Sequence, residues 1–389
     1  MSTPLAVLDL TPVPSGSTTA QALANSADLA EFAERFGYAR YWVAEHHLNP
    51  GVVGVSPAVV LALVAGRTRT IRLGSAALQT GHRTVISAVE DFALLDAVHP
   101  GRIDLGLGRP GGPPRQKGGA LPAAPPPPTR EEQEGAVVDG LRVPGPFPLA
   151  PLLTAPRFGA VPELVPILNT GTPDAPGTFD RQVDTVLDLL AGTWKSSAGV
   201  PLQVHPGTGA DLQLWLFGST GGTTAEVAGE RGLRFGANYH VAPQGVLDAA
   251  RAYRAAFRPA ASPSGLAQPH LAVSADVVVA ETDEEAEHLA AGYGPWVRSI
   301  RTAAGAIPYP TPQEAAELTA PGRWTEDDDA LVRDRLATRF VGSAATVVEG
   351  LERLRDATGA DELLVTTTTH DHAARVRSYE LLAQEWGDR

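Results

Sequence analysis

Histidines are concentrated at the ends of predicted β-strands, and this placement is the first indication of catalytic residues in the sequence. The chain contains ten histidines. Imidazole exchanges a proton near neutral pH, so histidines grouped at one edge of a sheet predict acid–base work. Six of the ten follow apolar, strand-like runs: His46, His47, His82, His240, His370 and His372.

The segment Glu45-His46-His47, with two adjacent histidines, directly follows the second predicted strand. We interpret His46 and His47 as candidate catalytic residues, because reactive groups of α/β barrels gather at strand ends. Two other interpretations stay open on the residues alone. One imidazole could bond a loop carbonyl while the other is solvated. Both could instead join His370-Asp371-His372 around a zinc-like ion, although no complete carboxylate ligand set accompanies them.

Two further segments predict anion binding. Arg109 follows a strand-like run and offers a fixed cation for a phosphate, with a loop-holding ion pair as the alternative. The turn at residues 218–224 leads from an apolar strand into a helix, where small residues, hydroxyl groups and the helix N-terminus favour an anion. An ordinary helix cap is the alternative there. The candidate phosphate-binding residues of this turn are Gly218, Ser219 and Thr220.

Residues 106–111 match the dinucleotide pattern G-x-G-x-x-G, but a Gly/Pro-rich loop follows instead of the required helix. Histidine and arginine do not carry electrons, so an oxidoreductase built on these residues needs a cofactor. A single phosphate site indicates a mononucleotide such as FMN.

The elements that must position these residues alternate between strand and helix, which is typical of a parallel sheet wrapped by helices. Irregular sequence interrupts the alternation twice, in a long Pro/Gly-rich insertion at about residues 110–178 and in a second insertion at about residues 295–340. Without both insertions about 274 residues remain, close to a (β/α)₈ barrel. We predict one TIM-barrel domain over residues 1–389, with a doubly wound open sheet as the alternative. The predicted strands are residues 5–10, 41–44, 71–77, 103–107, 212–217, 235–238, 271–279 and 363–367.

The composition excludes several classes of protein. A net charge of −13 argues against a nucleic-acid partner. No apolar run approaches the roughly 18 residues of a membrane span, and the first residues lack a signal-peptide layout. Because the sequence has no cysteine, disulfides, iron–sulfur clusters and thiolate nucleophiles are excluded. We expect an acidic, cytoplasmic protein without a bound metal.

The candidate residues above and the segments around them, taken in chain order, resemble the bacterial luciferase-like flavin monooxygenases. The similar blocks run from Leu5 to about Trp386 and leave out only the two insertions. They are Tyr41-Trp42-Val43-Ala44-Glu45-His46-His47 and residues 56–58, 67–75, 99–109, 215–219, 238–240, 340–343 and 360–363.

The resemblance implies a (β/α)₈ barrel that takes reduced FMN at its C-terminal mouth from a separate NAD(P)H-dependent flavin reductase. It implies oxygenation of a small organic substrate through a flavin peroxide. By position, His46 corresponds to the catalytic histidine and Arg109 to an arginine at the flavin phosphate. Ser219 and Thr220 fall in the phosphate-binding turn. Ala76-Ala77 corresponds to a non-prolyl cis peptide beneath the flavin ring.

The sequence also departs from luciferase itself. Gly108 stands where luciferase has a reactive cysteine, and the lid after the fourth strand is replaced by unrelated proline-rich sequence. We therefore expect a non-luminescent member. A deazaflavin-dependent oxidoreductase and a non-catalytic flavin-binding protein remain alternatives on the same barrel. Relatives commonly pair, which makes a homodimer the expected assembly.

Overall fold

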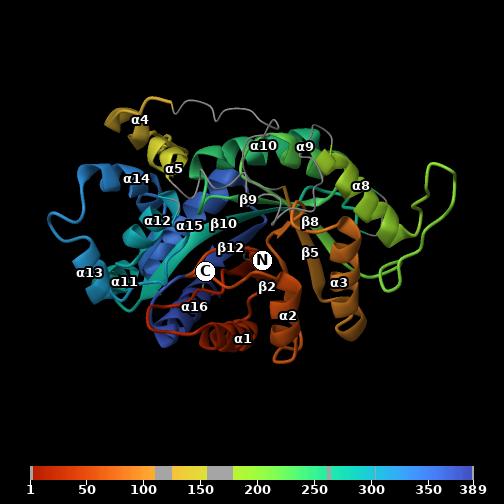
Figure 1. Cartoon of the computed structure of the whole chain (residues 1–389), viewed down its shortest axis with the longest axis horizontal. Coiled ribbons are helices and arrows are strands. Elements are labelled where there is room, and N and C mark those ends of the chain that lie inside the picture. Colours follow the sequence, from red (N-terminus) through yellow and green to blue (C-terminus); the bar gives the residue numbers. More distant parts are fainter. Residues whose placement is uncertain (1–2, 110–124, 156–177, 261–263, 303, 388–389) are drawn as a thin grey trace.

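Eight parallel strands close into a barrel with helices on its outside (Figure 1). The computed structural model describes residues 3–109, 125–155, 178–260, 264–302 and 304–387. The strand order is β12-β1-β2-β3-β5-β8-β9-β10, and β10 pairs in turn with β12. This closure confirms the predicted barrel over the doubly wound sheet. The strands are β1 (Leu5–Asp9), β2 (Arg40–Val43), β3 (Arg72–Ser75), β5 (Ile103–Gly108), β8 (Gln213–Gly218), β9 (Arg234–Asn238), β10 (Leu271–Ala280) and β12 (Glu362–Thr366).

The crossover helices start at local sequence signals. Thr18 and Thr84 cap α1 and α3 by accepting hydrogen bonds from backbone N–H groups of the first turn, and Pro57 occupies the first turn of α2. The helices are α1 (Thr19–Arg35), α2 (Pro57–Ala65), α3 (Val85–Val98), α8 (Thr178–Ala191), α9 (Thr223–Glu230), α10 (Val246–Ala256), α11 (Asp283–Ala290), α15 (Ala344–Thr358) and α16 (His372–Gly387).

Charged side chains fill the N-terminal end of the barrel. The fully buried carboxylate of Asp104 accepts hydrogen bonds from Arg40 at 2.8 Å, from Arg72 at 2.6 Å and from the Trp42 indole at 2.9 Å. Glu362 binds the other side of the Arg40 guanidinium at 2.9 Å. Because these charges neutralise one another, this end of the barrel serves stability.

Aromatic rings occupy the next layer toward the C-terminal end. The rings of Trp42 and Trp215 lie 4.7 Å apart between centroids, and Phe217 packs edge-on against Trp42 at 5.4 Å. Added Cβ atoms at Gly236 and Gly106 would lie 2.3 and 2.6 Å from Phe217, so these two glycines make room for that ring. The barrel is therefore closed below the ring of Phe217.

The two irregular insertions contain more regular structure than their composition predicts. In the second, expected to be irregular from 295 to 340, lie three helices: α12 (Tyr293–Arg301), α13 (Pro312–Leu318) and α14 (Glu326–Leu336). Capping boxes at Thr311 and Thr325 start α13 and α14, and they are local signals that the predicted irregular segment leaves out. β11 (Phe340–Ser343) follows and extends the sheet beside β10.

The first insertion contains α4 (Arg130–Glu134), an antiparallel hairpin of β6 (Ala136–Val138) and β7 (Leu141–Val143), and α5 (Ala150–Thr154). Its residues 110–124 and 156–177 lie outside the described residues. A short β4 (Leu78–Gln79) pairs with β5 near the mouth. Among the described residues, no helix combines the length and apolar character needed to cross a membrane.

Candidate functional site

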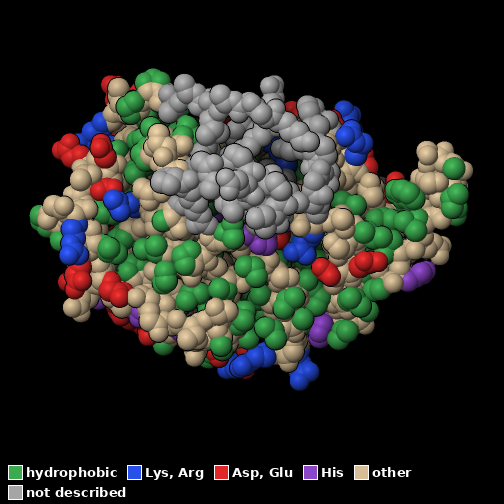
Figure 2. Space-filling model, in the orientation of Figure 1, with side chains coloured by type: hydrophobic (Ala, Val, Ile, Leu, Met, Phe, Trp, Pro, Cys, Tyr) green, Lys and Arg blue, Asp and Glu red, His purple; other side chains and the backbone are tan. Residues whose placement is uncertain are grey.

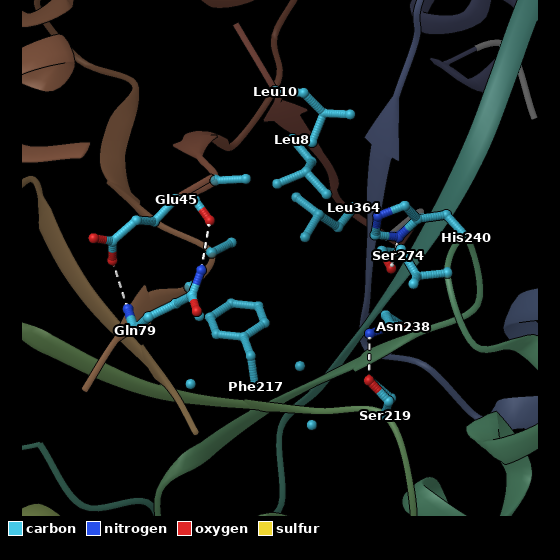
Figure 3. Close-up of a pocket in the computed structure, with 18 of the residues that line it drawn as sticks. Leu8, Leu10, Glu45, Gln79, Phe217, Ser219, Asn238, His240, Ser274 and Leu364 are labelled. Atoms are coloured by element: carbon cyan, nitrogen blue, oxygen red, sulfur yellow. Dashed lines mark hydrogen bonds between the residues drawn. The ribbon is translucent and has the colours of Figure 1, made fainter. Parts of the chain in front are cut away.

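A cavity of about 210 Å³ opens at the C-terminal end of the barrel, above Phe217 (Figure 3). Its wall combines apolar residues at β1 and β12 with polar residues that lie in β9 and β10 or follow β2, β3, β5, β8 and β9. The polar lining residues are Glu45, His46, Gln79, Arg109, Ser219, Asn238, His240 and Ser274. Residues distant in sequence thus meet at the rim where barrel enzymes hold their ligands.

His46 reaches this cavity as predicted. The residue is half-buried, and its Nδ1 atom is buried without a hydrogen-bond partner in the structure. Burial lowers the pKa of His46, and the smaller effect of Glu45 raises it. The result is a pKa lowered to about 4. The imidazole is therefore neutral at pH 7 and offers one nitrogen that no described residue occupies.

His47, the other candidate catalytic residue, does not line the cavity. Its Nε2 atom lies 2.9 Å from Glu45 Oε1, and its ring packs edge-on against His82 at 4.7 Å between centroids. The chain after β2 thus directs His46 to the cavity and His47 to Glu45 and His82. The structure thus places His47 in a supporting network.

Glu45 is the centre of that network. Its carboxylate accepts hydrogen bonds from the Gln79 backbone N–H at 2.6 Å and from Arg83 Nη2 at 3.0 Å. The Gln79 side chain donates back to the Glu45 carbonyl at 2.9 Å, as Figure 3 shows. These bonds tie the end of β2 to the turn after β3.

The Ala76-Ala77 peptide lies in that turn, and both alanines line the cavity. The bond between them is cis, as the family resemblance implies. Opposite it is Gly108, where an added Cβ would lie 3.0 Å from the Ala77 Cβ. A larger residue than glycine at position 108 would press on this peptide.

The candidate phosphate residues lie on the β5 and β8 side of the rim. Arg109, Gly218 and Ser219 line the cavity, whereas Thr220 is exposed and does not. Asn238 Nδ2 donates to Ser219 Oγ at 2.7 Å. Because that oxygen accepts a bond, its own hydrogen is free to donate to an anion.

His240 and Ser274 form a second polar group in the wall. His240 Nδ1 lies 2.6 Å from Ser274 Oγ, and its ring points toward Leu364 across the cavity (Figure 3). Burial, then Arg335 and His46, lower the pKa of His240 to about 3. The sequence marks His240 by its place at a strand end, but Ser274 lies inside an apolar strand and carries no such signal.

The histidines after β12 do not join this site. His370 Nε2 lies 3.0 Å from the Ser15 carbonyl oxygen, and His372 Nε2 lies 2.9 Å from Asp28 Oδ2. Within the part of the chain that the structure describes, no group of three or more His, Asp or Glu side chains is arranged to hold a metal ion.

The closed barrel and the polar cavity at its C-terminal rim define a (β/α)₈-barrel protein. The sequence profile of the luciferase-like monooxygenase family matches residues 3–133 and 183–362. The chain belongs to that family, as the resemblance predicts.

Two relatives align with nearly the whole chain, and a third aligns with part of it. The uncharacterized protein YvbT of Bacillus subtilis is 32% identical over 388 residues, 99% of this chain and 97% of its own. A luciferase-like monooxygenase of Escherichia coli is 29% identical over 376 residues, 96% of this chain and 94% of its own. The N-acetyl-S-alkylcysteine monooxygenase of Bacillus subtilis is 45% identical, but over only 109 residues, 28% of this chain and 33% of its own.

Solved structures share the fold. Apo-MsnO8 has a TM-score of 0.75 at 28% identity, covering 99% of this chain and 98% of its own. Another structure is the oxygenating constituent of 3,6-diketocamphane monooxygenase from Pseudomonas putida in complex with FMN. It has a TM-score of 0.61 at 18% identity, and the match covers 100% of this chain and 99% of its own. A coenzyme F420 dependent tetrahydromethanopterin reductase from Methanopyrus kandleri has a TM-score of 0.58 at 19% identity. The match covers 99% of this chain and 98% of its own.

Proposed function

We propose that the protein is an FMNH₂-dependent monooxygenase of a two-component system. The observation that carries the proposal is the meeting of three features at one cavity. These are a neutral His46 with an unpartnered nitrogen, the wall of small side chains at Ala76 and Ala77, and the anion donors Arg109 and Ser219. They correspond to the proton-handling, ring-supporting and phosphate-binding parts that the family resemblance assigns.

The residues present fit FMN. Arg109 and the Ser219 hydroxyl would hold the phosphate, because a guanidinium and a free hydroxyl hydrogen are suitable donors. Small side chains at Ala76, Ala77 and Gly108 leave one wall flat enough for a ring system. Reduced flavin supplies the two electrons that let O₂ insert one oxygen atom into the substrate and release the other as water.

His46 has the main chemical role among the side chains. Its neutral imidazole, with Nδ1 unpartnered, can hold or pass a proton at the cavity surface. The Glu45 network keeps the backbone on both sides of His46 and Ala77 in place. We assign Glu45, Arg83 and His47 as positioning residues, since none of their charged groups needs to contact the substrate.

For the substrate, thioether oxygenation is the first reaction to test. The relative named N-acetyl-S-alkylcysteine monooxygenase supports this choice over the segment it shares with the chain. The apolar half of the cavity wall, with Leu8, Leu10 and Leu364, suits an alkyl group.

The test begins with anaerobic titrations of reduced FMN, oxidised FMN and F420. We expect reduced FMN to bind most tightly, and little NAD(P)H oxidation by the protein alone. With a flavin reductase added, ¹⁸O from O₂ should enter the product. Tighter binding of F420, with hydride transfer and no oxygen uptake, would establish the deazaflavin alternative. Flavin binding without any turnover across a broad thioether panel would favour a binding protein.

We also propose a homodimer formed through α2 and α3. Helix α2 is apolar around its whole circumference, which is typical of a helix covered on both sides. Figure 2 shows apolar side chains over the face where α2 and α3 lie. The most exposed are Val59 and Leu63 on α2 and Leu94 and Val98 on α3, at 50–71%. A second copy of this face would cover them.

A further inference from the structure

His240 and Ser274 form a polar pair in the cavity wall, distinct from the residues assigned to flavin binding and proton transfer. Both residues line the cavity, and His240 Nδ1 lies 2.6 Å from Ser274 Oγ. Figure 3 shows the pair on the opposite side of the cavity from Glu45 and Gln79. The pair therefore lies at the cavity surface, where a ligand can contact it.

The backbone fixes the position of this pair. Ser274 on β10 is in register with Asn238, the last residue of β9, and the Tyr239 N–H donates to the Ser274 carbonyl at 3.1 Å. The Tyr239 side chain is buried, and its hydroxyl donates to the Arg142 carbonyl at 2.6 Å. His240 is the next residue and lies against Ser274 at the cavity. Strand pairing thus holds both members of the pair in place.

The pair has one hydrogen that no described residue accepts. A neutral imidazole carries one N–H and a serine carries one O–H, so two hydrogens are available. The bond between Nδ1 and Oγ uses one of them, whichever residue donates it. Among the described residues, neither side chain has a second hydrogen-bond partner. The other hydrogen, on Nε2 of His240 or on Oγ of Ser274, is therefore free to bind a ligand.

The surroundings of the pair favour a neutral acceptor over an anion. The ring of His240 points toward Leu364, which belongs with Leu8 and Leu10 to the apolar part of the wall (Figure 3). Burial lowers the pKa of His240 to about 3, so the pair is uncharged at pH 7. Among the described lining residues, Arg109 is the one arginine or lysine, and it follows β5. A carboxylate beside His240 would lose its hydration without gaining a counter-charge, whereas a carbonyl oxygen needs only one hydrogen.

We propose that His240 and Ser274 form a subsite for a neutral carbonyl oxygen of the organic substrate. The oxygen of a ketone, amide or ester would accept the free hydrogen of the pair, while the alkyl part of the substrate contacts the leucines. This inference rests on the proposed function, because it takes the cavity as the place where the organic substrate binds. It adds that a carbonyl compound is recognised in preference to a carboxylate of the same shape.

The experiment measures binding by calorimetry with reduced FMN present and O₂ excluded, so that no turnover occurs. Three probes of the same shape are compared. The first is 4-(methylthio)-2-butanone, a ketone. In the second, 2-methyl-4-(methylthio)-1-butene, a methylene group replaces the carbonyl oxygen. The third is the anion 3-(methylthio)propanoate.

The ratio of the alkene Kd to the ketone Kd reports the contribution of the carbonyl oxygen. In the double variant His240→Phe/Ser274→Ala this ratio should fall about tenfold below that of the parent, because one buried hydrogen bond is lost. The control His288→Phe, at an exposed position on α11, should keep the ratio of the parent. The parent should also bind the ketone at least about tenfold more tightly than the propanoate.

The alkene makes no use of the hydrogen, so it should bind the double variant at least as tightly as the parent, which excludes a folding defect. An unchanged ratio in that variant would overturn the subsite. Tighter binding of the propanoate than of the ketone, or no binding of any probe up to about 10 mM, would do the same. If the ratio falls as expected but no probe is oxygenated with reductase and O₂, the subsite stands and the monooxygenase proposal fails. If product forms and the ratio does not change, the subsite fails and the proposed function stands.

Discussion

The two rim histidines, His46 and His240, should make the folded protein sensitive to acid between pH 6.5 and pH 4. Their pKa values are lowered to about 4 and about 3, chiefly by burial. An unfolded histidine titrates near 6.5. Below pH 6.5 these two histidines therefore bind protons in the unfolded chain but stay neutral in the folded protein. The free energy of unfolding falls as the pH falls.

The magnitude follows from these pKa values. At pH 5 an unfolded histidine is almost fully protonated, whereas each rim histidine is still largely neutral. Each should then cost about 2 kcal/mol of stability between pH 7 and pH 5. Because both residues are half-buried, solvent screening reduces this toward about 1 kcal/mol. Together they account for a loss of roughly 2–4 kcal/mol.

Urea unfolding followed by tryptophan fluorescence at pH 7 and pH 5 measures this loss. The double variant His46→Gln/His240→Gln should lose roughly 2–4 kcal/mol less than the parent over the same pH interval. His288→Gln, an exposed histidine on α11, is the matched control and should behave as the parent. If the double variant loses as much stability as the parent, the rim histidines are not held neutral and the reasoning is wrong.

Three further results are expected. Arg109→Ala should weaken binding of reduced FMN by about 1.5–3 kcal/mol, whereas His46→Ala should retain flavin affinity and lose oxygenation. Anaerobic titration measures the affinity and a product assay measures the oxygenation. If the two variants behaved alike in both assays, the roles assigned to Arg109 and His46 would be wrong. Asp104→Ala should lower the free energy of unfolding by about 3–5 kcal/mol, because it removes the buried carboxylate that Arg40 and Arg72 share and leaves Glu362 as the acidic partner of Arg40. A loss below about 1 kcal/mol in urea melts would count against this. Val59→Glu combined with Leu94→Glu should give a monomer in light scattering, with native circular dichroism.

Much of the fold is readable in the sequence, because buried parallel strands are continuous apolar runs and their helices have clear periodicity and caps. The three helices between 293 and 336 were not predicted, although Thr311 and Thr325 mark the starts of α13 and α14. Long-range partners have no local signal. Nothing near Ser274 indicates that a histidine 34 residues away will bond to it.

The sequence alone determined that parallel strands alternate with helices and that His46, Arg109 and the turn at 218–224 follow strand ends, which meet at one rim if the sheet closes. The closure of the sheet into a barrel was seen only in the tertiary structure. Only the tertiary structure decided which of these side chains face the cavity. His46 enters it, whereas His47 turns to Glu45. Side-chain direction depends on packing between distant segments, and charge balance depends on which partners that packing brings together.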